Sequence, residues 1–338
     1  MLTANISTPA FLRLTRTMVT ELKTLETIIE NESNKITDKA LREKWTVYQL
    51  EDALSSLYDY DTSEVIEQVQ KKKTYPNSKI MDRAKLQDKY SFSGKKYATL
   101  MGKIITENQE KIANAVGHLD KRKIEKALKN ALPVRAKEKI IKMPLPIDVI
   151  RRSNVIRKAA DNGQLMSKTR RAEMNDIIKR VLKTKQIETK GGLVSKSIHL
   201  EVKKELNKYF ANYTKNSPPF GIPKNLHAIA VTETKGAINN MRHEYMKASS
   251  DISKKEGFAI YKKWRHNASL SLSKGTQSRP NHIAMARQKA IPMESQFELI
   301  LLDSKVKVSI NNPHDSTLPA SEVISCNCDV YYFFKRLK

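Results

Sequence analysis

The sequence has few of the residues that build disulfide scaffolds, tight turns or membrane spans. Among its 338 residues are 2 cysteines, 10 glycines and 2 tryptophans. Cys326 and Cys328 are too close together for an ordinary disulfide, and two cysteines are too few for a disulfide framework. No apolar run approaches the ~18 residues of a membrane span, and the N-terminal segment lacks a secretory pattern. We therefore expect a chain without a membrane-spanning segment that is assembled in a reducing cytoplasm.

Acidic residues are also scarce, and their distribution is uneven. The chain has 62 Lys and Arg against 36 Asp and Glu, which gives a net charge of +26. Residues 1–70 have a small acidic excess, whereas residues 71–190 have a net charge of +20. A run of lysine and arginine is usually a solvated helix face, but this excess is larger than solubility requires. Contact with phosphates, with release of their counterions, explains it better.

Few aromatic residues are interleaved with these basic residues, so stacking on single-stranded bases is not indicated. The basic segment therefore predicts binding to double-stranded DNA without sequence specificity. The competing partner is an acidic surface of another protein. The residues expected to contact DNA are Lys121, Arg122, Lys123, Arg135, Lys137, Arg151, Arg152, Arg157, Lys158, Arg170 and Arg171.

The first two hundred residues have the periodicity of helices. Apolar residues recur at spacings of three and four from Phe11 to Ile29, and a second stripe runs from Leu41 to Leu57. Helical patterns resume at residues 166–185 and 195–213, whereas three prolines in residues 133–146 predict a break. Long helices with narrow apolar stripes need a partner surface, so we expect the N-terminal helices to pack on each other or on a second copy.

The clearest boundary is the segment 216–223, with three prolines and one glycine. After it we predict a helix over residues 229–248 and strands over 258–264, 297–302, 306–310 and 330–334. The predicted fold class is α+β overall, with a mainly α-helical N-terminal region followed by a small α+β C-terminal domain. The predicted parts are an acidic helical docking region (1–70), a basic helical region (71–215), a Pro-rich linker (216–224) and the C-terminal domain (225–338).

Rare residues are concentrated after residue 226, where one Trp, both Cys and five of the seven His occur. In the same part of the chain stand, in order, Thr232-Glu233-Thr234, Trp264, Arg279 to His282, His314-Asp315 and Cys326 to Cys328. This ordered series resembles the phage Mu F-like family, the minor head or head morphogenesis proteins of tailed bacteriophages. The residues that carry the resemblance are Thr232, Glu233, Trp264, Arg279, His282, Asp315, Cys326 and Cys328.

The resemblance implies an α+β domain over residues 226–334 and a role in the virion rather than a reaction. Such proteins lie inside the phage head, associate with the portal during assembly, and assist DNA packaging or delivery. The expected partners are the portal, the major capsid or scaffold proteins, and double-stranded phage DNA. Val231 and Asn327 replace arginines common in the family, which weakens a catalytic interpretation, so we expect no enzyme activity. The alternatives are a metal-dependent or toxin-like enzyme, or a nucleic-acid-binding protein outside the virion.

Two side-chain sets in this domain each allow two interpretations. His282, His314, Cys326 and Cys328 offer the ligands that zinc prefers, but a one-residue gap is strained for chelation, and thiols two residues apart in a strand can simply share a core face. That spacing favours packing, so no cofactor is expected and zinc is the alternative. Glu233, Arg279 and His282 form either an acid/base cluster or a buried network in which Arg279 pairs with Glu233 and His282 donates to a carbonyl. The network is favoured, since no nucleophile has a motif-like spacing.

Overall fold

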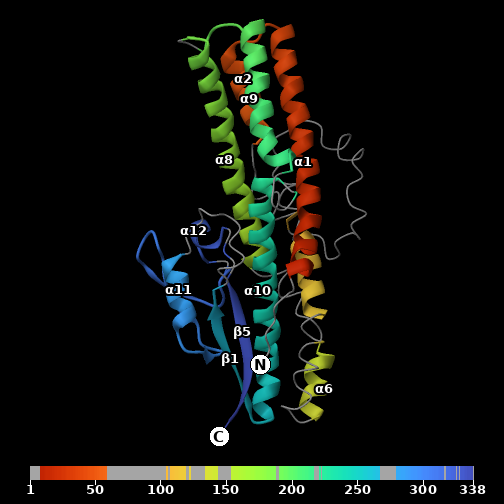
Figure 1. Cartoon of the computed structure of the whole chain (residues 1–338), viewed down its shortest axis with the longest axis vertical. Helices are drawn as coiled ribbons and strands as arrows, with labels where there is room; N and C mark the ends of the chain where they lie inside the picture. Colours follow the sequence, from red (N-terminus) through yellow and green to blue (C-terminus); the bar gives the residue numbers. More distant parts are fainter. Residues whose placement is uncertain are drawn as a thin grey trace. The chain divides into compact units, whose positions relative to one another are not determined.

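The computed structural model describes residues 8–58, 104–105, 107–118, 122, 134–143, 154–187, 190–216, 221, 223–266, 279–315, 317–324, 326 and 328–337. The chain forms two compact units (Figure 1). The helical unit comprises residues 16–107 and 156–227, and the α+β unit comprises residues 1–15, 108–155 and 228–338. The predicted fold class, α+β with a mainly helical N-terminal region, is confirmed. Among the described helices, none combines the length and apolar composition of a membrane-spanning segment.

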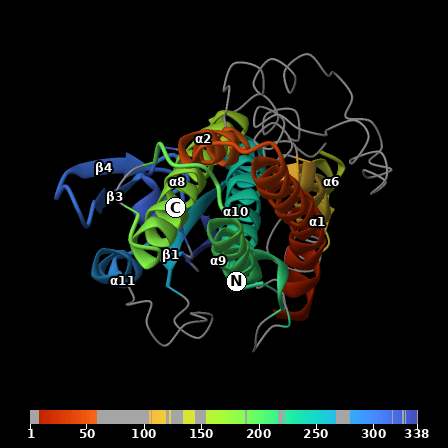
Figure 2. The same ribbon diagram turned by 90° about the horizontal axis from the view of Figure 1, so that it is seen from above.

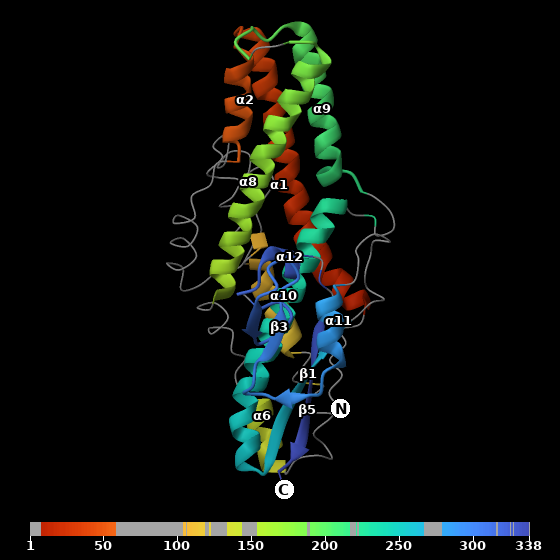
Figure 3. The same cartoon turned by 90° about the vertical axis from the view of Figure 1, so that its left-hand side faces the viewer.

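In the helical unit, four helices lie side by side (Figures 1 and 3). They are α1 (Thr8–Arg42, from residue 16 onward), α2 (Val47–Ser56), α8 (Asn154–Thr184, from residue 156 onward) and α9 (Lys196–Thr214). Their apolar stripes meet in a core that contains Leu22, Leu25, Leu54, Ile177 and Phe210. Polar contacts fix their register: α2 bonds to α8 through Ser55 and Asn175 at 2.6 Å, and α9 bonds to α8 through Tyr209 and Glu173 at 2.7 Å.

The predicted stripe from Leu41 to Leu57 is interrupted by a turn. Helix α1 ends at Arg42, and Lys44 follows with a φ of 54°, in the left-handed region. Thr46 then opens α2 with a capping box, because its side chain accepts from the backbone N–H of Gln49 while the Gln49 side chain accepts from the N–H of Thr46. These bonds satisfy N–H groups that have no partner within the helix, which is why the chain can restart a helix here.

Residues 133–146, predicted to interrupt helical structure, instead contain helix α6 (Val134–Lys142). The prediction of a break was wrong because Pro133 lies just before the first helical residue, where a proline costs no hydrogen bond, and Pro144 lies after the last. Ile140 of α6 belongs to the core of the α+β unit, and its carbonyl oxygen accepts from the Tyr245 hydroxyl at 3.0 Å. Residues 108–155 accordingly group with the C-terminal residues.

The α+β unit is built on an antiparallel sheet in the order β2-β1-β5. Its strands are β1 (Phe258–Arg265), β2 (Ile291–Pro292) and β5 (Asp329–Arg336), and β3 (Phe297–Ile300) pairs with β4 (Lys307–Ile310) as a second sheet (Figure 2). The four predicted strands are confirmed at these positions. Helix α10 (Lys224–Lys255) runs alongside β1 and β5 (Figures 1 and 3), and two short helices, α11 (Pro280–Arg287) and α12 (Ala320–Val323), complete the unit.

Alternation along β1 decides which side chains enter the core. Ile260, Lys262 and Trp264 are buried on one face, as the period of two requires. The indole of Trp264 packs edge-on against Phe297 at a centroid distance of 5.5 Å. In the pairing of β1 with β5, Trp264 lies opposite Val330 and Arg265 lies opposite Asp329. The ends of these two strands therefore bring His266 next to Cys328.

Candidate metal centre

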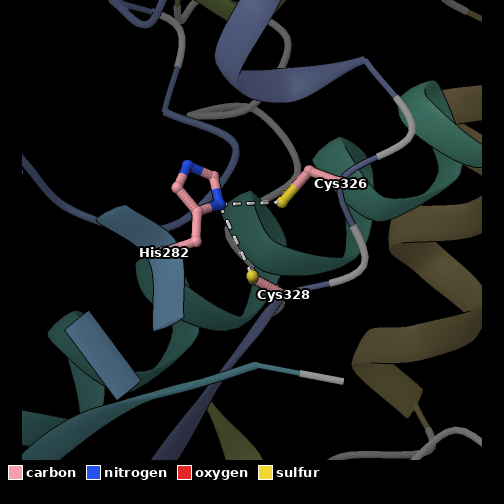
Figure 4. A group of neighbouring side chains, drawn as sticks. All are labelled: His282, Cys326 and Cys328. Carbon is pink, nitrogen blue, oxygen red and sulfur yellow. Dashed lines mark hydrogen bonds between the residues drawn. The ribbon is translucent and has the colours of Figure 1, made fainter. Parts of the chain in front are cut away.

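His282, Cys326 and Cys328 converge in the interior of the α+β unit (Figure 4). Nδ1 of His282 is 3.4 Å from Sγ of Cys326 and 3.5 Å from Sγ of Cys328. The possible ligand atoms of the three residues all lie within 4.8 Å of one another, and each residue is at most 2% exposed. Both thiols are free. One ring nitrogen thus faces two sulfur atoms in a site closed to solvent.

The start of α11 is what aims His282 at the cysteines. Pro280 occupies the first turn of α11, where its fixed φ favours helix initiation and its missing N–H costs nothing. Arg279, just before it, donates to the carbonyl oxygens of Ser321 at 2.8 Å and Ile324 at 2.7 Å. These bonds fasten α11 to α12 and to the residues just before Cys326.

Glu322 fixes the ring of His282 from the other side. Its Oε2 is 2.9 Å from Nε2 of His282, and both side chains are 1% exposed. The same carboxylate accepts from the backbone N–H of Leu302 at 2.6 Å and from the Asn281 amide at 3.1 Å. A carboxylate on the outer nitrogen of a histidine is the usual way in which proteins orient a metal-binding imidazole and set its tautomer. Here it directs Nδ1 toward the sulfurs.

Helix α10 holds the main chain around the cysteines. The Asn239 amide donates to the carbonyl oxygen of Cys328 at 3.1 Å, and Lys235 forms a buried ion pair with Asp329 at 2.9 Å. Glu233 accepts from Gln109 at 2.5 Å, whereas Arg279 bonds to carbonyl oxygens elsewhere. The expected pairing of Arg279 with Glu233 is therefore wrong.

His314, one of the four predicted metal ligands, contacts the main chain of the site. Its Nε2 is 3.0 Å from the carbonyl oxygen of Cys326, and it is not in the group of convergent ligands found among the described residues. The bond to a carbonyl that we expected for His282 is thus made by His314. Asp315 accepts from the backbone N–H groups of Asn311 at 2.8 Å and Thr317 at 3.1 Å, so it shapes the turn that carries His314.

The two buried thiols are hydrogen-bonded to each other, which shifts their pKa values in opposite directions. Hydrogen bonding with Cys328, and then with His282 and His314, lowers the pKa of Cys326 well below its usual range. Hydrogen bonding with Cys326, together with burial, raises the pKa of Cys328. Thiols bind a divalent cation as thiolates, so a metal at this site would release their protons.

His266 was not among the ligands predicted from the sequence. Its Nδ1 lies 3.4 Å from Sγ of Cys328. No local sequence signal identifies it, because its position follows from the strand register, in which the pairing of Arg265 with Asp329 makes His266 and Cys328 the next pair along the ladder. Burial lowers the pKa of His266, which favours the neutral imidazole that binds metals.

The predicted DNA-binding residues differ in their exposure, and some lie outside the described part of the chain. Arg122, Arg135 and Arg171 are exposed, whereas Arg170 is 3% exposed and ion-paired with Glu26. Arg170 is therefore unavailable to phosphates, and its inclusion was wrong. Lys137 lies on α6, and Arg157 and Lys158 lie on α8, but their side chains are outside the described part of the chain. Lys121, Lys123, Arg151 and Arg152 lie outside the described residues altogether.

Comparisons with models of protein families, with curated proteins and with solved structures find no match to this chain.

Proposed function

We propose that this chain is a minor head protein of a tailed bacteriophage, with a basic region that contacts packaged DNA and an α+β domain held together by Zn²⁺. One observation carries the proposal. Residues that resemble the Mu F-like series are up to about a hundred positions apart, yet several of them surround one buried centre. Trp264 packs edge-on against the His282 ring at 5.3 Å, and His282 faces Cys326 and Cys328.

The distances support zinc. A tetrahedral site with Zn–S bonds of about 2.3 Å and Zn–N bonds of about 2.0–2.1 Å places sulfur and nitrogen about 3.5 Å apart. The distances from Nδ1 of His282 to the two sulfurs are 3.4 and 3.5 Å. Zinc also prefers this mixture of thiolate and imidazole ligands to an all-oxygen set.

The proposed role of the metal is structural. Its ligands come from α11 and from the segment between α12 and β5, and Arg279 and Glu322 already connect those elements. A metal there fixes the end of β5 against α11. A structural metal of this kind takes part in no reaction. We therefore propose that the domain acts in assembly, on the portal and against capsid or scaffold proteins within the head.

The proposed DNA contact is electrostatic. Arg122, Arg135 and Arg171 are exposed members of a segment with a net charge of +20. We expect the full-length protein to bind duplex DNA of any sequence, with an affinity that falls about 10³-fold or more between about 50 and 200 mM salt if six or more phosphates are neutralised. The triple substitution Arg122→Ala, Arg135→Ala and Arg171→Ala lowers the slope of log K against log salt by about 0.9 for each phosphate that is no longer neutralised.

A matched control removes the same charge elsewhere. Arg42, Arg287 and Arg336 are exposed arginines outside the basic segment, and their triple alanine variant should keep the wild-type slope. Equal losses in both triple variants would show that only net charge matters. A salt-independent affinity, or no binding at low salt, would remove the DNA role.

The virion assignment has a separate test. Mass spectrometry of purified phage heads should detect this chain in a few copies relative to the portal. Its absence from heads, with the chain instead found only in the host cell lysate, would contradict the proposed function.

A further inference from the structure

A second histidine, His266, contacts Sγ of Cys328. We infer that His266 is the fourth ligand of this centre, so that the site is a closed Cys₂His₂ site formed by His266, His282, Cys326 and Cys328. The inference rests on the metal of the proposed function and goes beyond it, because it decides between a closed structural site and one with an open position.

The convergent group within 4.8 Å consists of His282, Cys326 and Cys328, and His266 contacts it through Sγ of Cys328; the measured distances match three edges of a tetrahedron with two nitrogens and two sulfurs. Such a site has four nitrogen–sulfur edges, each of about 3.5 Å with zinc at its centre. Three of them are measured here: 3.4 Å from His282 to Cys326, 3.5 Å from His282 to Cys328, and 3.4 Å from His266 to Cys328.

The sheet explains why His266 occupies this position. β1 and β5 pair over their whole length, and the ladder ends with Arg265 opposite Asp329. His266 and Cys328 are the next residues on the two strands, so a contact between their side chains follows from the backbone register. The metal would clamp the end of the β1–β5 ladder to α11.

His314 is the competing fourth ligand. Its Nε2 is 3.0 Å from the carbonyl oxygen of Cys326, and His314 also interacts with the Cys326 thiol, whereas Nδ1 of His266 lies 3.4 Å from Sγ of Cys328. Because Nε2 of His314 is already bonded to a carbonyl oxygen, we assign His314 to the support of the main chain and His266 to the metal. If neither His266 nor His314 were a ligand, the site would have three protein ligands, His282, Cys326 and Cys328, and a water. That is the arrangement of catalytic zinc.

The test uses the full-length protein loaded with Zn²⁺ or Co²⁺, since the visible absorption of Co²⁺ reports its coordination number. The wild type should bind one ion with a four-coordinate Co²⁺ spectrum. His266→Ala should weaken Zn²⁺ binding at least about 100-fold, because loss of a ligand exceeds the 10–100-fold cost of losing an outer-shell partner. His314→Ala should cost less than this and keep the four-coordinate spectrum. His199→Ala, on α9 of the helical unit, is the matched control and should leave the Zn²⁺ affinity and the Co²⁺ spectrum unchanged.

A second variant guards against misfolding. His266→Cys keeps a ligand, so it should retain the metal and add thiolate-to-cobalt absorption, while His314→Cys should not. Wild-type affinity and spectrum in His266→Ala, or loss of the four-coordinate spectrum in His314→Ala alone, would overturn the inference while leaving the zinc proposal intact. Failure of the wild type to bind either ion would overturn both.

Discussion

Each of the two units of this protein contains a buried polar cluster of a different kind. In the helical unit, the guanidinium of Arg170 lies against the carboxylate of Glu26, with both side chains at most 3% exposed. Four aromatic rings surround the guanidinium, those of Tyr58, Tyr209, Phe210 and Tyr213, at 3.5–5.8 Å from its carbon. In the α+β unit, imidazole and thiol groups face one another instead.

The difference lies in whether the chain supplies its own counter-charge. Arg170 and Glu26 neutralise each other, and the faces of the aromatic rings favour the cation further. Two thiols and a histidine nitrogen are all electron-pair donors once the thiols ionise, so the arrangement is complete only with a cation at its centre. The cluster around Arg170 is therefore an internal ion pair, whereas the cluster of His282, Cys326 and Cys328 points to a ligand.

The largest expected effect is the loss of stability when the two thiols of the candidate metal centre are removed. Cys326→Ala with Cys328→Ala should destabilise the α+β unit on the order of 5–10 kcal/mol, given that structural zinc sites bind with about 10–16 kcal/mol at pH 7. Amide hydrogen exchange, read separately over residues 228–338 and 156–227, should show reduced protection only in the first range. Chelation of the wild type should reproduce this reduction, and added Zn²⁺ should reverse it. If the thiols only pack, the double variant should cost about 1–2 kcal/mol and be insensitive to zinc.

The second largest effect is expected from breaking the buried ion pair of Arg170 with Glu26 in the helical unit. Arg170→Met leaves Glu26 buried without its partner and should cost about 3–5 kcal/mol in thermal or denaturant unfolding. The double variant Glu26→Leu with Arg170→Met should recover most of that stability, because apolar side chains of similar volume replace the pair. Arg180→Met is the control, since its pair with Glu205 is 56% exposed on the arginine side and should matter by less than about 1 kcal/mol. Equal costs for the Arg170 single and double variants would contradict this account.

A smaller effect concerns the support of the metal ligand. Glu322→Gln keeps the size of the side chain but removes the charge that orients His282, so metal affinity should fall about 10–100-fold. Competition with a chromophoric chelator measures the change. Glu298→Gln, at an exposed pair with Lys307, is the control and should leave the metal affinity unchanged.

The smallest expected effect is the pH dependence contributed by a buried lysine. Lys262 donates to the carbonyl oxygen of Asn311 at 3.3 Å, and burial lowers its pKa to about 8, opposed by Asp315 and Glu294 and assisted by Lys247. Between this value and the ordinary lysine value, the unfolded chain binds a proton that the folded chain has released, so the free energy of unfolding rises with pH. From pH 8 to 9 the rise should be about 1 kcal/mol relative to Lys262→Met. Parallel curves for the two proteins in denaturant titrations would contradict the assignment.

Periodicity was enough to predict much of the fold. The apolar spacing in residues 11–29 and the alternation in residues 258–264 correspond to α1 and β1. Other features had local sequence signals that apolar periodicity does not detect. One is the capping box of Thr46 and Gln49, which marks the start of α2 after α1. The burial of Arg170 also had a local signal. Arg170 lies four, seven and eleven residues before Met174, Ile177 and Val181, and this spacing places it on the buried stripe of α8.

The candidate metal site could be predicted only in part. The sequence supplies ligand types that zinc prefers, and three of the four candidate ligands converge. Strand alternation does not govern the two thiols, because β5 begins at Asp329, after both cysteines. The choice between His266 and His314 depends on the register of β1 against β5, and a register between strands about 70 residues apart is not written in any local pattern.

The central claim is that the α+β unit holds a metal ion at His282, Cys326 and Cys328. Native mass spectrometry of the intact protein, purified without chelator, tests it most directly. The account predicts a mass increase of one zinc ion per chain, which His282→Ala abolishes and which His199→Ala, on α9 of the helical unit, retains. A metal-free wild type that stays fully folded and takes up no Zn²⁺ on titration would contradict it.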